Sequence, residues 1–191
     1  MAQADVIEGV DLTDDEYHVA QSLIRNKFKV TDTDGNLVLR AKQKLFKMKE
    51  EFPFVDGDGD DVFTVKAEGV LDIAGDYTIV EAGSEDPIAV LGKNFTLLKH
   101  EWTVKDPDSS DVWAEIESRS ALFQLLRGFV PFGGLIPHSY TIETPAGGSI
   151  GAIEGRLSIR DRYDIEIDEP GDVPREALVA AAIAVDALEG N

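Results

Sequence analysis

Alternation of apolar and polar residues recurs along most of this chain, in segments that flank turn-forming residues. Four segments share one form, in which an aromatic residue, a polar residue and an aliphatic residue lead into a turn and a second alternating run follows. The turns contain Asp-Gly, Pro-Asp or Gly-Gly, which favour a tight connection between antiparallel strands. These segments begin at Phe28, Tyr77, Trp102 and Tyr140, and further alternating runs cover Val62–Ala67, Asn94–Leu98 and Arg156–Ile167. The pattern predicts a succession of β-hairpins.

So many antiparallel strands have edges that must be paired or covered, and closing the sheet into a barrel removes the edges completely. A barrel of more than about eight strands is too wide for its own side chains to fill. Something else must therefore occupy the interior.

The C-terminal segment "REALVAAAIAVDAL" is suited to that place. Its middle, Ala177–Val185, has no polar side chain on any face of a helix, so it requires enclosure all round. It is far shorter than the roughly 20 apolar residues that cross a bilayer. We predict a helix over about residues 173–189, although a surface helix with one buried face is the alternative. Its core positions are Leu178, Val179, Ala181, Ala182, Ile183 and Val185.

The hairpins of the form "FKVTDTDGNLVL", the segment "HEWTVKD", the segment "GRLSIRDRYDIEID" and the terminal apolar helix resemble the LURP-one-related family. That family belongs to the tubby-like group, which includes the phospholipid scramblases. The resemblance implies a mainly β fold, a closed antiparallel barrel of about twelve strands around a central C-terminal hydrophobic helix. It also implies a binding or scaffold protein that is not an enzyme.

The beginning of the chain carries two conflicting signals. Thr13–Glu16 reads as a helix capping box, and the apolar residues that follow keep helical spacing. The family resemblance instead makes residues 17–24 the first barrel strand, which we favour because tertiary pairing often overrides local propensity. On this basis residues 1–16 are an N-terminal extension and residues 17–191 a single barrel domain.

Charge changes this picture more than any other feature of the composition. There are 37 acidic and 18 basic residues, which give a net charge of -19, and there is no cysteine. Such a charge destabilises a compact state through self-repulsion unless salt screens it, so we expect an acidic member of the haloarchaeal type. The dominance of acidic residues argues against nucleic acid as a partner. With no signal peptide and no transmembrane segment in the sequence, a cytoplasmic protein is expected.

Three motifs look chemical but have simpler interpretations. "GGSIG" at 147–151 matches the hydrolase pattern G-x-S-x-G, yet an alternating run follows it and no histidine comes later, so a hairpin turn is preferred. "DGDGDD" at Asp56–Asp61 lacks the spacing of a calcium-binding loop. His18, His100 and His138 are scattered along the chain. We therefore expect no catalytic residue, no metal site and no cofactor, while an enzyme with an unrecognisable motif stays an alternative.

Two segments remain as candidates for binding. The first is "RAKQKLFKMK", whose cations could bind an anion or a lipid headgroup, or could simply line an outward strand face. The second is the apolar segment at Leu122–Pro137, which could contact a membrane or a partner protein, as in a scramblase-like protein. The cations of the first segment are Arg40, Lys42, Lys44, Lys47 and Lys49.

Raising the KCl concentration from millimolar to molar should increase the melting temperature, because the added salt screens the repulsion among the excess carboxylates. Thermal unfolding followed by circular dichroism at neutral pH checks this expectation. A melting temperature that stays constant over the whole range would contradict the inference of adaptation to salt.

Overall fold

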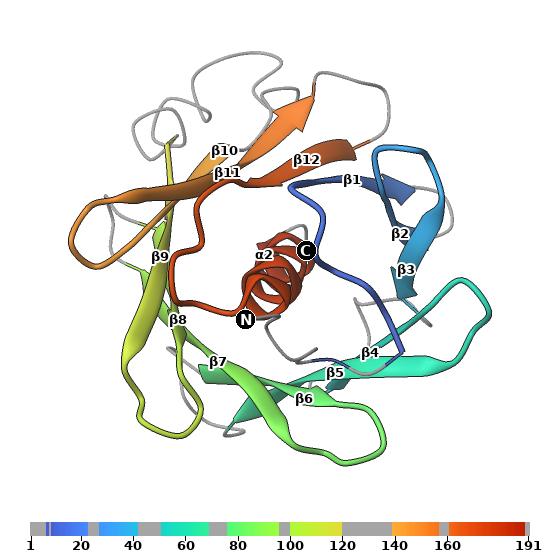
Figure 1. Ribbon diagram of the computed structural model, residues 1–191, viewed down its shortest axis with the longest axis horizontal. Helices are drawn as coiled ribbons and strands as arrows, with labels where there is room; N and C mark the ends of the chain where they lie inside the picture. The colour runs from blue at the N-terminus through green and yellow to red at the C-terminus, as the bar shows by residue number, and fades with distance from the viewer. Residues whose placement is uncertain are drawn as a thin grey trace.

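The computed structural model describes residues 7, 9–22, 27–41, 51–68, 76–95, 100–119, 139–156 and 161–189. In this part of the chain, twelve strands form a ring around one helix, α2 (Arg175–Glu189), as Figure 1 shows. The strands are β1 (Glu16–Ser22), β2 (Lys27–Thr31), β3 (Leu37–Ala41), β4 (Glu51–Val55), β5 (Asp61–Glu68), β6 (Asp76–Glu81), β7 (Pro87–Phe95), β8 (His100–Lys105), β9 (Val112–Ser118), β10 (Ser139–Glu143), β11 (Ser149–Arg156) and β12 (Asp161–Ile167).

Every strand pairs with its neighbours in the sequence, and β1 pairs with β12 to close the barrel. All of the pairs are antiparallel, as expected for strands joined by hairpins. The four segments predicted as hairpins form β2–β3, β6–β7, β8–β9 and β10–β11. The prediction of a closed antiparallel barrel of about twelve strands around a C-terminal helix is therefore confirmed.

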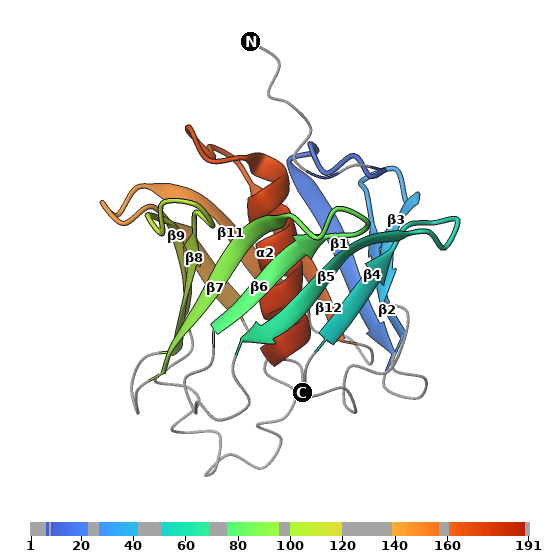
Figure 2. The same cartoon turned by 90° about the horizontal axis from the view of Figure 1, so that it is seen from below.

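The helix α2 fills the middle of the barrel along its length, as Figures 1 and 2 show together. All nine residues from Ala177 to Val185 are at most 1% exposed, on every face of the helix. A surface helix with one buried face is thus excluded. The helix begins where the carbonyl of Pro174 accepts a hydrogen bond from the amide of Leu178, at 3.2 Å. Alanine at five of these nine positions keeps the helix thin enough for the side chains of the strands to pack around it.

Inward-facing aromatic side chains pack next to the short ladder between β3 and β4. Between β3 and β4 the ladder joins two residue pairs, Arg40 with Val55 and Ala41 with Phe54. Inside the barrel, Phe54 packs edge-on against Phe28, with ring centroids 5.8 Å apart, and stacks on Phe63 at 4.7 Å. These contacts link β2, β4 and β5 across the short ladder.

The end of the barrel at which α2 begins is covered by residues that precede β1. Ile7 and Leu12 are buried in the same core as the strands and the helix. The carboxylate of Glu176, 4% exposed, accepts a hydrogen bond from the backbone amide of Ile7 at 3.1 Å. Arg175 forms an ion pair with Asp15 at 2.6 Å and donates to the carbonyl of Ile167. The start of the helix is therefore tied both to the N-terminal segment and to the last strand.

The helical interpretation of the capping box is wrong, because residues 16–22 form β1 and pair with β2 and β12. Thr13 donates its hydroxyl to the carboxylate of Asp11, and the amide of Asp14 donates to the hydroxyl of Tyr17. Burial raises the pKa of that Tyr17 hydroxyl. A ladder on each side of β1 satisfies its backbone groups, which outweighs the local preference for a helix.

Several hairpin turns begin with a side chain that accepts hydrogen bonds from the turn itself. One carboxylate oxygen of Asp56 accepts the backbone amides of Asp58, Gly59 and Asp60 at 2.7–2.9 Å. Asp106 accepts the amides of Asp108 and Ser109 in the same way. The turn chemistry of the sequence thus has a specific role, which is to pair the amides that the ladder leaves over.

Ala181→Arg should abolish folding, because the substitution places an unpaired charge and a long side chain where the interior is already filled. The control is Ala146→Arg, the same substitution at an exposed turn position, which should leave the fold intact. Near-ultraviolet circular dichroism of the soluble fractions makes the comparison. A native spectrum for Ala181→Arg would contradict the enclosed position of the helix.

Asp56 should stabilise the protein in a pH-dependent way. Amide hydrogen bonds from Gly59 and Asp60 lower the pKa of its carboxyl, and nearby Arg40 contributes to the same direction. The stabilisation is complete above the unfolded pKa of about 3.9 and is lost as the pH falls through the lower, folded value. Asp56→Ala should therefore lower the melting temperature by a few degrees at pH 7, and the gap to wild type should close below about pH 4.

The matched control for this prediction is Asp58→Ala, which removes a carboxylate from the same turn but leaves the Asp56 cap in place. This variant should not lose melting temperature at pH 7. Equal losses in both variants, or a gap between Asp56→Ala and wild type that persists at low pH, would contradict the role of the cap.

Candidate functional site

In the described residues, the side chains of α2 and the inward side chains of the strands pack together in the middle of the barrel. A gap of about 170 Å³ lies near the end of α2, between the helix and the strands β4 and β5. Small-molecule sites are usually about 300–1,000 Å³ and contain several polar groups. This gap is lined by apolar side chains alone, which are Phe52, Phe54, Val65, Ala184, Ala187 and Leu188. This gap is therefore a poor candidate for a binding site, and the exposed polar side chains of the described residues are better ones.

The end of the barrel at which α2 begins is strongly acidic in the described residues. At the end where α2 begins, residues 9–15, five hairpin turns and the connection from β12 to α2 contain 16 acidic residues and no lysine, arginine or histidine. This end is called the acidic rim, and it lies at the top of Figure 2. The turns and the connection are residues 32–36, 56–60, 82–86, 106–111, 144–148 and 168–174.

The opposite rim is defined by the other ends of the strands, from Ser22 and Lys27 to Arg156 and Asp161. Six stretches outside the described residues join these ends. In sequence they carry eight of the 18 basic residues of the chain and two of its 37 acidic ones, so the bias is the reverse of that at the acidic rim. These stretches are 23–26, 42–50, 69–75, 96–99, 120–138 and 157–160.

The predicted anion-binding segment begins in the described part of the chain and continues outside it. Arg40 lies in β3, half-buried, and its guanidinium is so close to the turn of Asp56 that a Cβ at Gly59 would be 2.9 Å from Nη2. The positive charge of Arg40 therefore lies beside the acidic turn of Asp56. Lys42, Lys44, Lys47 and Lys49 lie outside the described residues, as does the apolar segment Leu122–Pro137, so their roles stay predictions.

The hydrolase-like motif "GGSIG" is a hairpin, as expected. Gly147 adopts a φ of 82° in the turn, and Thr144 Oγ1 accepts the amide of Gly148 at 2.9 Å. Ser149 is exposed and begins β11, whereas a nucleophile elbow needs a helix after the serine. A Cβ on Gly151 would lie 2.0 Å from the carbonyl oxygen of Glu166 on β12, so the last glycine permits close strand pairing.

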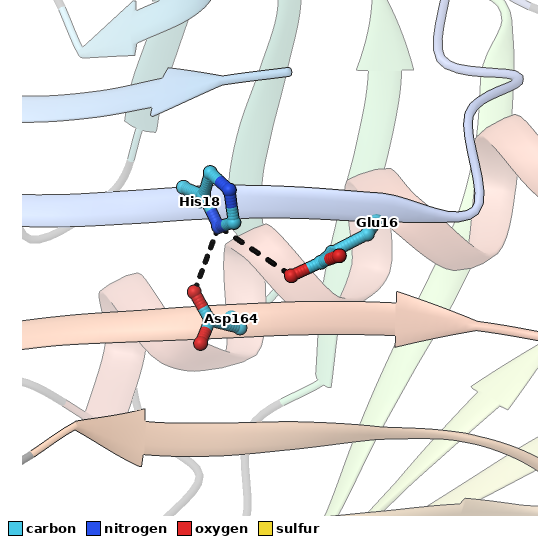
Figure 3. Close-up of side chains that lie close together, drawn as sticks. All are labelled: Glu16, His18 and Asp164. Carbon is cyan, nitrogen blue, oxygen red and sulfur yellow. Dashed lines mark hydrogen bonds and ion pairs between the residues drawn. The ribbon is translucent and has the colours of Figure 1, made fainter. Parts of the chain in front are cut away.

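One group of chemically active side chains was missed in the sequence. On the outer face of the barrel, where β1 and β12 meet, His18 Nδ1 lies 2.8 Å from Asp164 Oδ1 and 3.7 Å from Glu16 Oε1 (Figure 3). Asp164 also pairs through its other oxygen with Arg156 of β11. Glu16, His18 and Asp164 are called the seam cluster, and their ligand atoms are close enough together to hold a metal ion.

A sequence signal for half of the seam cluster exists. Glu16 and His18 are two residues apart on a strand and so share one face. Asp164 is 146 residues from His18, and only the closure of the barrel brings it into register with that histidine. The expectation that histidines have no suitable neighbours rested on spacing along the chain, which does not detect contacts made by closure.

Comparisons with known proteins agree with this fold. The model of the LURP-one-related family matches residues 39–186, which is well over half of the chain. An X-ray structure of a protein from Arabidopsis thaliana superposes with a TM-score of 0.55 at 13% identity, over 95% of this chain and 99% of that one. At this identity the likeness shows the fold alone. No curated protein matches. No helix in the described residues is long and apolar enough to cross a membrane.

Proposed function

This chain belongs to the LURP-one-related family, and we propose that it is a non-enzymatic cytoplasmic protein that binds anionic phosphate groups through the rim opposite the acidic rim. The phosphate belongs either to a lipid headgroup or to a free ligand. The family is not a known enzyme family. The basic segment from Arg40 to Lys49 is the main binding element of this proposal.

Two observations support the proposal: the acidic rim in the structure, and the basic bias in the sequence of the stretches that join the strands at their other ends. The acidic rim has 16 acidic residues without a basic one, so it repels an anionic surface. The stretches that join the strand ends at the opposite rim carry an excess of basic residues, four of which are the lysines between 42 and 49. A phosphate-bearing partner is therefore favoured at one end of the barrel and disfavoured at the other.

The length of the barrel keeps the two charge biases separate. The 15 residues of α2 span about 22 Å between the rims, at about 1.5 Å per residue. The Debye length is about 10 Å at 0.1 M salt, so the acidic rim is largely screened from an anion at the opposite rim. At about 1 M salt the Debye length falls to about 3 Å, and direct contacts alone then hold a phosphate.

The filled interior favours binding at the outer surface over a reaction inside the barrel. A reaction site or a lipid path through the barrel would need space that α2 occupies in the described structure. In the sequence, the apolar segment Leu122–Pro137 lies between β9 and β10, and this proposal includes it as a second candidate for contact with a phospholipid.

The test compares Lys42→Ser/Lys44→Ser with wild type in sedimentation with phosphatidylcholine vesicles that contain or lack phosphatidylserine. Near a bilayer each lysine contributes about 1 kcal/mol at ordinary ionic strength, so the double variant should bind the anionic vesicles about 30-fold more weakly. A parallel titration with inorganic phosphate distinguishes a headgroup from a free anion.

The matched control is Lys29→Ser/Lys105→Ser, which also removes two positive charges. Lys29 is exposed and lies opposite Arg40, whose guanidinium reaches the turn of residues 56–60 at the acidic rim, and Lys105 ends β8 at that rim. This control should bind like wild type. If both variants bind equally weakly, net charge alone explains the binding and the proposed site is wrong. The absence of binding to vesicles and to phosphate would also overturn the proposal.

A further inference from the structure

We propose that the seam cluster, Glu16, His18 and Asp164, is a binding site for a divalent transition-metal ion on the outer face of the barrel. The site would hold the first strand against the last. It is independent of the proposed phosphate binding, because none of its residues belongs to the basic segment or to the stretches that join the opposite rim.

The geometry needs little change to accept an ion. One ligand atom from each residue, His18 Nδ1 and one oxygen of Glu16 and of Asp164, lies within 4.8 Å of the other two. A metal about 2.0–2.2 Å from each ligand needs these atoms roughly 3–3.6 Å apart. Rotations of the Glu16 and His18 side chains close that difference. The strand positions need not change, since the ladder already places His18 opposite Asp164.

The cluster has a fixed ligand and two adaptable ones. Asp164 is 7% exposed, and Arg156 holds its Oδ2, which leaves Oδ1 directed at His18. Partners of this kind orient ligands in metal sites. The side chains of His18 and Glu16 are 37% and 36% exposed, so water can complete the coordination shell from the outside.

Repulsion within the same ladder favours a cation here. Glu16 is directly opposite Glu166, whose side chain is exposed on the same outer face. Like charges in such a pair destabilise a sheet, and a divalent ion next to Glu16 offsets that repulsion. Arg156 pairs with Asp164, and Arg162 is exposed on the same face of β12, so two positive charges stand against the carboxylates of Glu16, Asp164 and Glu166.

The ligand set selects the class of metal. One imidazole nitrogen with two carboxylate oxygens suits Zn²⁺, Co²⁺, Ni²⁺ or Cu²⁺, whereas Mg²⁺ and Ca²⁺ prefer oxygen ligands throughout. Because β1 and β12 meet only in the folded barrel, an ion that bridges them binds the folded state and stabilises it.

The experiment titrates the chelator-treated full chain with ZnCl₂ by calorimetry and repeats the thermal melt with ZnCl₂ and with MgCl₂. We expect saturable binding of one Zn²⁺ per chain and a melting temperature that rises with Zn²⁺ but not with Mg²⁺. His18→Gln and Glu16→Gln should each weaken Zn²⁺ binding at least tenfold. Wild type with Cu²⁺ should show nitrogen coupling in its paramagnetic resonance spectrum, and His18→Gln should lose that coupling.

The matched control is Glu154→Gln, the same substitution at the residue opposite Asp164 on β11, where Glu154 pairs with Arg119 instead. It should bind Zn²⁺ like wild type. If Glu154→Gln weakens binding as much as Glu16→Gln does, the ion is attracted by net charge and the proposal fails. Binding that His18→Gln leaves unchanged, or no saturable binding, overturns it equally.

Discussion

The requirement of α2 for apolar surroundings on every face is the constraint on which the rest of this structure depends. A closed ring of strands buries every face of such a helix, and a ring of twelve strands is wide enough to enclose it. The ring in turn needs another element at its centre, because the side chains of so many strands do not reach the barrel axis. The helix and the ring of strands therefore stabilise each other. The C-terminal helix is needed for the strands that come before it to form a filled barrel.

Filling the interior moves polar chemistry to the surface. The apolar core extends from Leu12 at one rim to Ala187 near the other, and charged groups are distributed around it. At the acidic rim the carboxylates of Asp56 and Asp106 accept turn amides, and those hydrogen bonds lower the pKa of each. Part of the negative charge thus stabilises the turns through hydrogen bonds, while the remaining carboxylates leave the acidic rim with an excess of negative charge.

Closure of the ring creates a junction between segments that are far apart in the sequence. On its inner side Tyr17 and Ile165 belong to the core, and on its outer side His18 lies against Asp164. At the start of the helix Arg175 connects the junction to Asp15. The same pairing therefore joins the barrel, fixes the entrance of the helix and brings together the only three described residues with metal-ligating geometry.

Local patterning was sufficient to determine the hairpins, the apolar helix and, through their combination, the closed barrel. Period-2 alternation and turn residues act between neighbours, and the absence of any polar face between Ala177 and Val185 leaves enclosure as the remaining solution. Tertiary structure decided what depends on distant pairing. It made Glu16–Ser22 a strand against its local helical signal, and it brought Asp164 to His18 across 146 residues. Side-chain periodicity reports which face a residue occupies, but which strand lies next to that face is set by closure of the whole sheet.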